Sequence, residues 1–143
     1  MKKMLCATDH SEISQKAEVF AANWAKEHGC ELAYAYVSHI TEKDMEPKAS
    51  RSSISILKDV ALQEHQVFVH AKQVAEEAGL PEVQCVLLRS HKVAATLVKY
   101  AEKEGVDHII VGSTGSKGLT RLTLGSVAGK IIAEASCPVT VVR

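Results

Sequence analysis

Short apolar segments alternate along the chain with longer segments in which apolar residues recur every three or four positions. The short segments are typical of buried β-strands, because they are nearly continuous runs of apolar residues. The longer segments have the spacing of amphipathic helices, beginning with Ile13, Ala17 and Phe20. We therefore predict five strands, at Lys3–Thr8, Glu31–Val37, Val83–Arg89, Asp107–Val111 and Pro138–Val142.

Residues that start and stop helices bound the segments between these strands. Asp9-His10-Ser11 precedes the first helix, and Gly29 follows it at the position where glycine commonly ends a helix. The second helix is predicted from about Ser53 to Ala78, because Gly79-Leu80-Pro81 stops it. The remaining predictions are a helix from a Ser90 cap to Gly105, a helix from Ser126 to Ala135, and a mobile polar loop over His39–Ser52.

Regular alternation of strands and helices predicts the fold class. Apolar strands separated by helix-length crossovers form a parallel sheet that is covered on both faces. Right-handed crossovers then give a doubly wound α/β fold with three layers. The chain has 143 residues, the length of one ordinary domain, and it shows no internal repeat. We predict a single domain over residues 1–143.

Composition narrows the classes of partner. The 17 Lys and Arg residues balance 17 Asp and Glu residues, so the net charge at pH 7 is zero. A neutral chain has no overall attraction to nucleic acid or to an anionic membrane. Aromatic residues make up 4% of the chain, which disfavours a base-stacking surface. We expect no nucleic-acid partner and no membrane partner.

Cysteine spacing and the first residues indicate the compartment. The four cysteines, at positions 6, 30, 85 and 137, include no CxxC pair, so neither a zinc site nor a thioredoxin-like motif is indicated. The first apolar run stops at Asp9, which is too early for the core of a signal peptide. We expect a cytoplasmic protein with free thiols.

A glycine-rich loop follows the fourth predicted strand. Gly112, Gly115 and Gly118 let the backbone approach a ligand closely, and Gly125-Ser126 opens a helix whose first N–H groups are unpaired. Backbone donors and the helix dipole together favour an anion, most naturally phosphate. A flexible connection is the alternative, but three glycines among hydroxyl residues favour the phosphate site. Further hydroxyl donors are Ser113, Thr114, Ser116 and Ser126, and Lys117 and Arg121 add positive charge.

Other common sites do not fit the sequence. Ile131 stands where a Walker A loop needs Ser or Thr, and no glycine fingerprint follows the first strand. No GxSxG elbow is present, and His65 and His70 are five residues apart, which does not suit a metal-binding helix. Asp9 ends the first strand, so it either caps the first helix or faces a ribose or magnesium ion. Ser11 can also cap that helix.

The spacing Gly112-x2-Gly115-x9-Gly125-Ser126 resembles the nucleotide loop of the universal stress protein family. The resemblance extends along nearly the whole chain, including Asp9-x-Ser11 after the first strand and the closing segment Cys137–Val142. It implies a strand order of 3-2-1-4-5 and an adenine-nucleotide site, which binds ATP, with Mg²⁺, in the family branch that keeps this loop. It also implies a homodimer through the last strand, Val139 to Val142.

The resemblance also implies which residues surround the nucleotide. Asp9 would face the ribose or the metal, Ala7 and Val37 would line the adenine pocket, and Gly112 and Gly115 would lie near the ribose and phosphates. Gly125, Ser126 and Val127 would hold the phosphates. The full set of candidate residues is Ala7, Thr8, Asp9, Val37, Val111, Gly112, Ser113, Gly115, Ser116, Gly125, Ser126 and Val127.

One turn departs from the family pattern. After the third strand the family often has a glycine, whereas this chain has Arg89-Ser90-His91-Lys92. These residues either narrow the pocket or add phosphate contacts through Arg89 and Lys92. Three functions stay open: an ATP-binding sensor or adaptor of the stress response with an unidentified partner protein, a slow ATPase using Asp9 or His10, and a nucleotide-free dimeric interaction module.

Overall fold

A five-stranded parallel sheet forms the centre of the protein. The computed structural model describes residues 2–9, 11–38, 51–114 and 124–143, and within 51–60 only the backbone. The sheet order is β3-β2-β1-β4-β5, and every neighbouring pair is parallel. Both the parallel sheet and its order are as predicted. The strands are β1 (Lys3–Ala7), β2 (Glu31–Ser38), β3 (Gln84–Arg89), β4 (His108–Gly112) and β5 (Val139–Val142).

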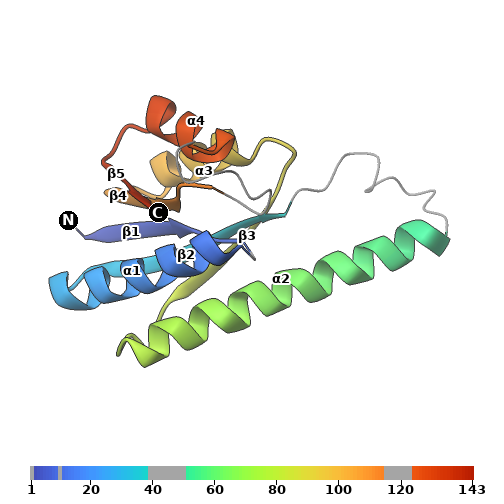
Figure 1. The fold of residues 1–143 in the computed structure, drawn as a ribbon, viewed down its shortest axis with the longest axis horizontal. Coiled ribbons are helices and arrows are strands. Elements are labelled where there is room, and N and C mark those ends of the chain that lie inside the picture. The colour runs from blue at the N-terminus through green and yellow to red at the C-terminus, as the bar shows by residue number, and fades with distance from the viewer. Residues whose placement is uncertain (1, 10, 39–50, 115–123) are drawn as a thin grey trace.

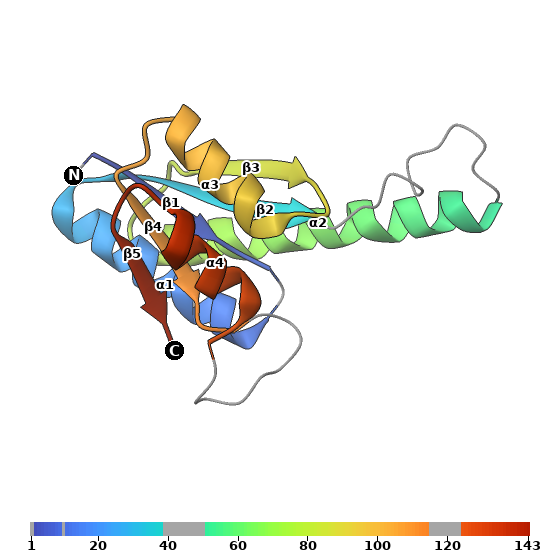
Figure 2. The same cartoon turned by 90° about the horizontal axis from the view of Figure 1, so that it is seen from above.

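Helices cover both faces of this sheet, which confirms the doubly wound fold. Figure 1 shows α1 (Glu12–His28) and α2 (Arg51–Glu77) below the sheet, with α3 (Val93–Lys103) and α4 (Ser126–Glu134) above it. The N-terminal part of α2 extends beyond the sheet in Figure 1 and again in Figure 2, after the view has been turned by 90°. The predicted mobile loop lies outside the described residues, except for 51 and 52, which already belong to α2.

Alternation along the strands separates two hydrophobic cores. On β1, Leu5 packs among residues of the α3–α4 side, whereas Met4 and Cys6 pack on the α1–α2 side. The same alternation sends Ile109 to the first core and Ile110 to the second. All five are almost completely buried. The central strands therefore contribute apolar side chains to both cores, as expected for a parallel sheet covered by helices on both faces.

Small residues let α1 approach the sheet. The buried face of α1 includes Ala17, Ala21, Ala22 and Ala25. The helix begins after Ser11, whose hydroxyl accepts the N–H of Ser14, and it ends at Gly29 with φ of 66°. Ser11 is therefore the N-cap, and the glycine stop predicted from the sequence is confirmed.

The start of α3 differs from the prediction. Ser90 is not its N-cap, because Lys92 occupies that position and makes no side-chain capping bond. The N–H of Ser90 donates to the carbonyl oxygen of Ser38 at 3.1 Å, which keeps this residue beside β2. The Ser90 hydroxyl instead accepts the N–H of Lys92 at 3.0 Å, so it stabilises the turn before the helix.

The strand order reverses between β1 and β4. From β1 the chain proceeds to β2 and β3 on one side, then returns to β4 and β5 on the other. The carboxyl ends of β1 and β4 consequently lie side by side, with Cys6 in register with Ile110. Ligands of open α/β sheets bind at such a reversal, so the residues that follow β1 and β4 form the candidate binding site.

Candidate functional site

Asp9 stands just past the end of β1 and is held by the first turn of α1. One carboxylate oxygen, Oδ1, accepts the N–H of Ser11 at 2.7 Å. The Ser14 hydroxyl donates to the carbonyl oxygen of Asp9 at 2.7 Å and accepts its N–H at 3.2 Å. Asp9 therefore supports the helix start, although the cap itself is Ser11. Both backbone polar groups of Asp9, its N–H and its carbonyl oxygen, are thus held by Ser14 of α1.

Gly112 ends β4 beside the same helix turn. A Cβ atom at this position would lie 2.7 Å from Cγ2 of Ile13, which is too close for any side chain without movement. The missing side chain thus lets β4 pack against α1. Beyond it, the N–H of Ser113 donates to the carbonyl oxygen of Val142 at 2.7 Å, which extends the pairing of β4 and β5. The two strand ends are joined into one rigid edge.

The two ends of the glycine-rich segment lie next to each other. The N–H of Gly125 donates to the carbonyl oxygen of Ser113 at 2.6 Å, so the two ends of the segment meet. Gly125 is the N-cap of α4 and provides no side-chain cap. The N–H groups of the first turn of α4 therefore begin next to the end of β4, which is the arrangement of a helix-terminus anion site.

Across residues 1–143 the sequence matches the model of the universal stress protein family. Universal stress protein MJ0531 of Methanocaldococcus jannaschii is 35% identical over 143 residues, covering 99% of this chain and 82% of the relative. The chain belongs to the universal stress protein family.

Solved structures with the same fold agree with this placement. UspA from Lactobacillus plantarum superposes with a TM-score of 0.85 at 23% identity, covering 99% of this chain and 97% of that one. A universal stress protein described as a complex with cAMP has a TM-score of 0.77 at 21% identity, covering 99% and 97%. One from Archaeoglobus fulgidus, described as a complex with dAMP, has a TM-score of 0.66 at 19% identity, covering 100% and 98%.

Eleven of the twelve predicted site residues of this universal stress protein fall into three groups. Ala7, Val37, Val111 and Val127 belong to the core on the α3–α4 side, where Val37 and Val111 are buried. The second group surrounds the junction of β1, β4 and α4, and it contains Asp9, Gly112, Ser113, Gly125 and Ser126. Gly115 and Ser116 lie outside the described residues.

Thr8 completes the set, but its side chain is turned to the opposite side of the sheet. Its hydroxyl donates to Oε1 of Glu18, and the residue is buried. The same hydroxyl also lies 3.4 Å from the carbonyl oxygen of Asp9. The N–H of Thr8 donates to the carbonyl oxygen of Ala35 at 2.9 Å, which fixes the strand end against β2.

Glu18 is a polar residue that the sequence analysis missed. Its carboxylate is 1% exposed, and besides Thr8 it contacts Nδ1 of His70 on α2 at 2.9 Å. The Tyr34 hydroxyl donates to its backbone carbonyl oxygen at 2.9 Å. Burial raises the pKa of Glu18, while the Thr8 hydrogen bond and the His70 charge act in the opposite direction. A signal was available, because Glu18 falls on the alanine-rich face of α1, where a charge is unexpected.

Arg89 is directed toward α2. Its guanidinium donates to the buried carboxylate of Glu64 through Nε at 3.4 Å and Nη2 at 3.2 Å. The sequence left open whether the turn after β3 narrows the pocket or adds phosphate contacts. A phosphate contact by Arg89 would have to compete with its ion pair to Glu64. Lys92 is exposed at the start of α3.

Asp9 also has the chemistry of a magnesium ligand. Mg²⁺ bound with a nucleotide usually takes one or two carboxylates together with phosphate oxygens and water. Asp9 supplies a carboxylate just past β1, the strand beside β4, and the end of β4 meets the N-terminus of α4. One oxygen of this carboxylate accepts the N–H of Ser11. Among the described residues, no three His, Cys, Asp or Glu side chains cluster as a metal site. A single carboxylate such as that of Asp9 fits a metal that a nucleotide also coordinates.

The cysteines and the helices lie apart from this site. The four cysteines all lie in the described part of the chain and are thiols that form no disulfide, and Cys6 and Cys30 are buried. Burial raises the pKa of the Cys6 thiol well above its usual value. None of the helices in the described part of the chain combines the length and apolar character needed to cross a bilayer.

Proposed function

We propose that this universal stress protein binds ATP, together with Mg²⁺, at the carboxyl edge of its sheet. The observation that carries the proposal is the 2.6 Å hydrogen bond between the Gly125 N–H and the Ser113 carbonyl oxygen. It places the N-terminus of α4 against the end of β4, next to the strand end that presents Asp9. A helix N-terminus and a carboxylate on adjacent elements suit the phosphates and the metal of one nucleotide.

Different residues would contact the phosphates, the ribose or metal, and the base of the nucleotide. The α4 N-terminus, with Ser126, would bind the phosphates, and Asp9 would face the ribose or Mg²⁺. Ala7 and Val37 would contact the base from the α3–α4 side of the sheet. That solved structures of the same fold are described as cAMP and dAMP complexes supports an adenine nucleotide. Bound ATP would supply a state that a partner protein can recognise, so the protein would act as a sensor or adaptor in the stress response.

The first test identifies what the purified protein carries. Protein isolated without added nucleotide is denatured, and the released small molecules are separated by chromatography and identified by mass spectrometry. We expect adenine nucleotide in near-equal amount to the protein, with ATP predominating. Protein that is empty, and whose unfolding temperature does not change with ATP and Mg²⁺, would contradict the proposal. Recovery of ADP after loading with pure ATP would indicate hydrolysis.

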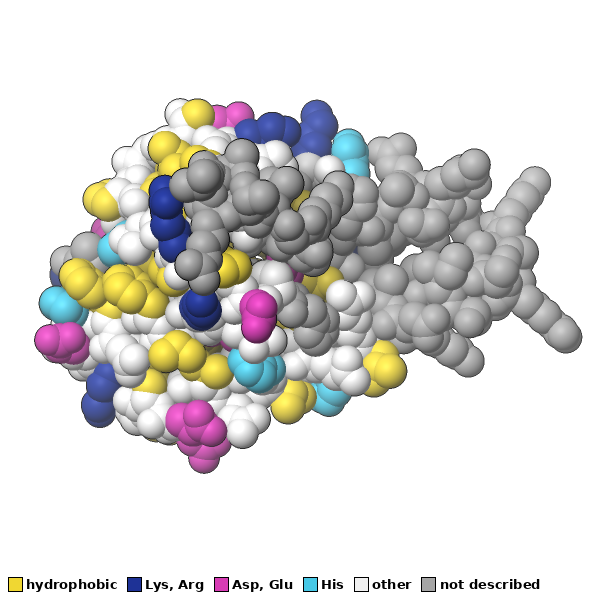
Figure 3. All heavy atoms as spheres, in the orientation of Figure 1, with side chains coloured by type: hydrophobic (Ala, Val, Ile, Leu, Met, Phe, Trp, Pro, Cys, Tyr) yellow, Lys and Arg dark blue, Asp and Glu magenta, His cyan; other side chains and the backbone are white. Residues whose placement is uncertain are grey.

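We also propose that the protein is a homodimer joined through β5. Its side chains are half-buried, and β5 ends the strand order, so its outer edge has no paired strand within the described residues. Phe20 on α1 and Ile132 on α4 are apolar and exposed. Figure 3 shows hydrophobic side chains on the surface of this side of the molecule, between α1 and the upper layer. Pairing with a second copy would cover an edge that otherwise invites aggregation.

Substitution of Val141 tests the dimer. Pro138 and Val142 both turn their carbonyl oxygens to β4, so the backbone of Val139 and Val141, at the alternate positions, faces outward. Val141→Pro removes an outward N–H and is expected to give a monomer, because edge strands tolerate proline but cannot pair through it. Sedimentation equilibrium should give twice the 15.5 kDa chain mass for the wild type and one mass for the variant. A wild type that stays monomeric at high concentration would refute the dimer.

A further inference from the structure

Three polar residues, the N-cap of α1 and two residues of the helix itself, contact the end of β1. Ser11, Ser14 and Glu18 are spaced by three and four residues, which places them along one side of the helix. Ser11 and Ser14 hold Asp9, and Glu18 holds the hydroxyl of Thr8. The strand end is thus fixed from a single helix face, on which Ser14 and Glu18 are buried.

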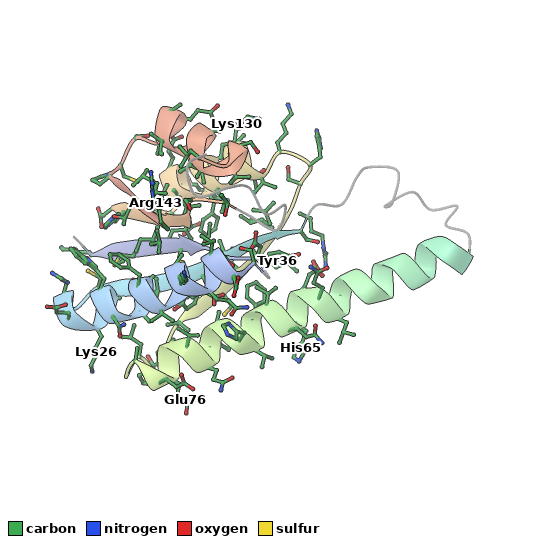
Figure 4. The ribbon with its side chains drawn as sticks, viewed as in Figure 1. Lys26, Tyr36, His65, Glu76, Lys130 and Arg143 are labelled. Carbon is green, nitrogen blue, oxygen red and sulfur yellow. The ribbon has the colours of Figure 1, made fainter. Side chains whose placement is uncertain are left out.

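Glu18 extends this arrangement to α2. Its second carboxylate oxygen contacts His70, whose side chain is 42% exposed and can exchange protons with water. A buried carboxylate needs a countercharge, and protonated His70 is placed to provide it. Figure 4 shows His65, on the same helix, pointing away from the sheet, so the two histidines have different surroundings. The other titratable groups whose charges act with Glu18 are Cys6, Asp9, Tyr34 and Cys85.

We propose that Glu18 is a positioning residue that transmits the protonation state of His70 on α2 to the Thr8–Asp9 end of β1. The proposal rests on geometry: one carboxylate, excluded from water, has Thr8 on one oxygen and His70 on the other. Its consequence for ligand binding rests on the proposed nucleotide site. It would make the alignment of Asp9, and with it nucleotide affinity, depend on whether His70 carries a proton.

The direction of the pH effect follows from the charges. While His70 is protonated, the pair is neutral overall, and Glu18 accepts hydrogen bonds at both oxygens. When His70 loses its proton, the negative charge of Glu18 is no longer balanced, and it adds to the repulsion that Asp9 exerts on a phosphate. Nucleotide affinity should therefore be lower when His70 is neutral than when it is protonated.

Nuclear magnetic resonance of the nucleotide-free protein tests the transmission directly. The amide resonances of Thr8 and Asp9 should shift with the same midpoint as the His70 imidazole. The shift should disappear in Glu18→Gln, which keeps the size and the hydrogen-bonding ends of the side chain, and in His70→Gln. His10 follows Asp9 in the chain and His65 lies on α2, so His10→Gln and His65→Gln are the matched controls, in which the shift should persist.

Either of two results would overturn the positioning role. One is an Asp9 amide that ignores the titration of His70, and the other is a shift that persists unchanged in both Glu18→Gln and His70→Gln. Should Glu18→Gln fail to fold, His70→Gln decides the question alone, because its half-exposed side chain can be replaced without burying an amide.

Nucleotide affinity gives the second readout. The ratio of wild-type to Glu18→Gln affinity for Mg-ATP should fall by about fivefold between about pH 6 and about pH 8.5, at the low end of ordinary coupling between sites. Titration of ATP itself cancels in this ratio. A wild type that binds no adenine nucleotide would refute the proposed function, while the amide titration still decides the role of Glu18. Binding with a pH-independent ratio would refute the coupling alone.

Discussion

Replacing Gly125 with valine is expected to abolish nucleotide binding. A Cβ atom at this position would lie 3.0 Å from the carbonyl oxygen of Ser113 and 3.2 Å from Cα of Thr114. Both neighbours are backbone atoms, so the new side chain can fit only if α4 moves away from β4. Losing two charge-assisted hydrogen bonds to phosphate would weaken binding by more than about a hundredfold. Overpacking should also lower the free energy of unfolding by roughly 1–3 kcal/mol.

A second glycine on the same helix supplies the control. A Cβ atom on Gly129 would meet only Cδ2 of Leu124, at 3.8 Å, which is ordinary contact. Gly129→Ala should therefore leave affinity unchanged and stabilise the helix by roughly 0.5–1 kcal/mol. Calorimetric titration with Mg-ATP and thermal unfolding measure both quantities. If folded Gly125→Val bound Mg-ATP with wild-type affinity, the phosphates could not lie at the N-terminus of α4.

The strands were accessible from the sequence because burial on both faces leaves a clear pattern, whereas their order followed from the family resemblance. β4 illustrates this, since His108–Gly112 is buried throughout and falls within one residue of the predicted segment. Helix ends were less predictable. Ser90 has the right chemistry for a cap, but its N–H bonds to Ser38, which lies far away in the sequence. Long-range contacts of this kind leave no local signal.

The candidate site also has some features with a local sequence signal and others that depend on long-range contacts. The spacing of its glycines and the position of Asp9 after a strand are local features, so the sequence located them. What it could not supply is the structural role of these residues: Gly112 makes room for Ile13, and Arg89 is paired with Glu64. Glu18 was missed because its partners come from a strand and from another helix. A single charge on an apolar helix face indicates that partners exist without telling which they are.

Replacing Asp9 by asparagine should separate its two roles. The amide side chain of Asp9→Asn would keep an oxygen that can accept the N–H of Ser11, a bond of 2.7 Å in the wild type, but it would lose the negative charge. We expect the free energy of unfolding to fall by only about 0.5 kcal/mol, the contribution of a charge near a helix N-terminus. Mg²⁺ should strengthen ATP binding at least about tenfold in the wild type and not in Asp9→Asn, because a neutral amide is a poor ligand for this ion.

Asp9→Ala completes the comparison, since it removes the hydrogen bond as well as the charge. It should cost about 1 kcal/mol more than Asp9→Asn in thermal unfolding while giving the same loss of Mg²⁺ dependence. Affinity is measured for ATP with Mg²⁺ and with a chelator. Without the metal, Asp9→Asn should bind ATP slightly more tightly than the wild type, because repulsion between the carboxylate and the phosphates is gone. An asparagine variant that responds to Mg²⁺ as the wild type does would restrict Asp9 to supporting the start of α1, and the metal would then have to be held by phosphate and water alone.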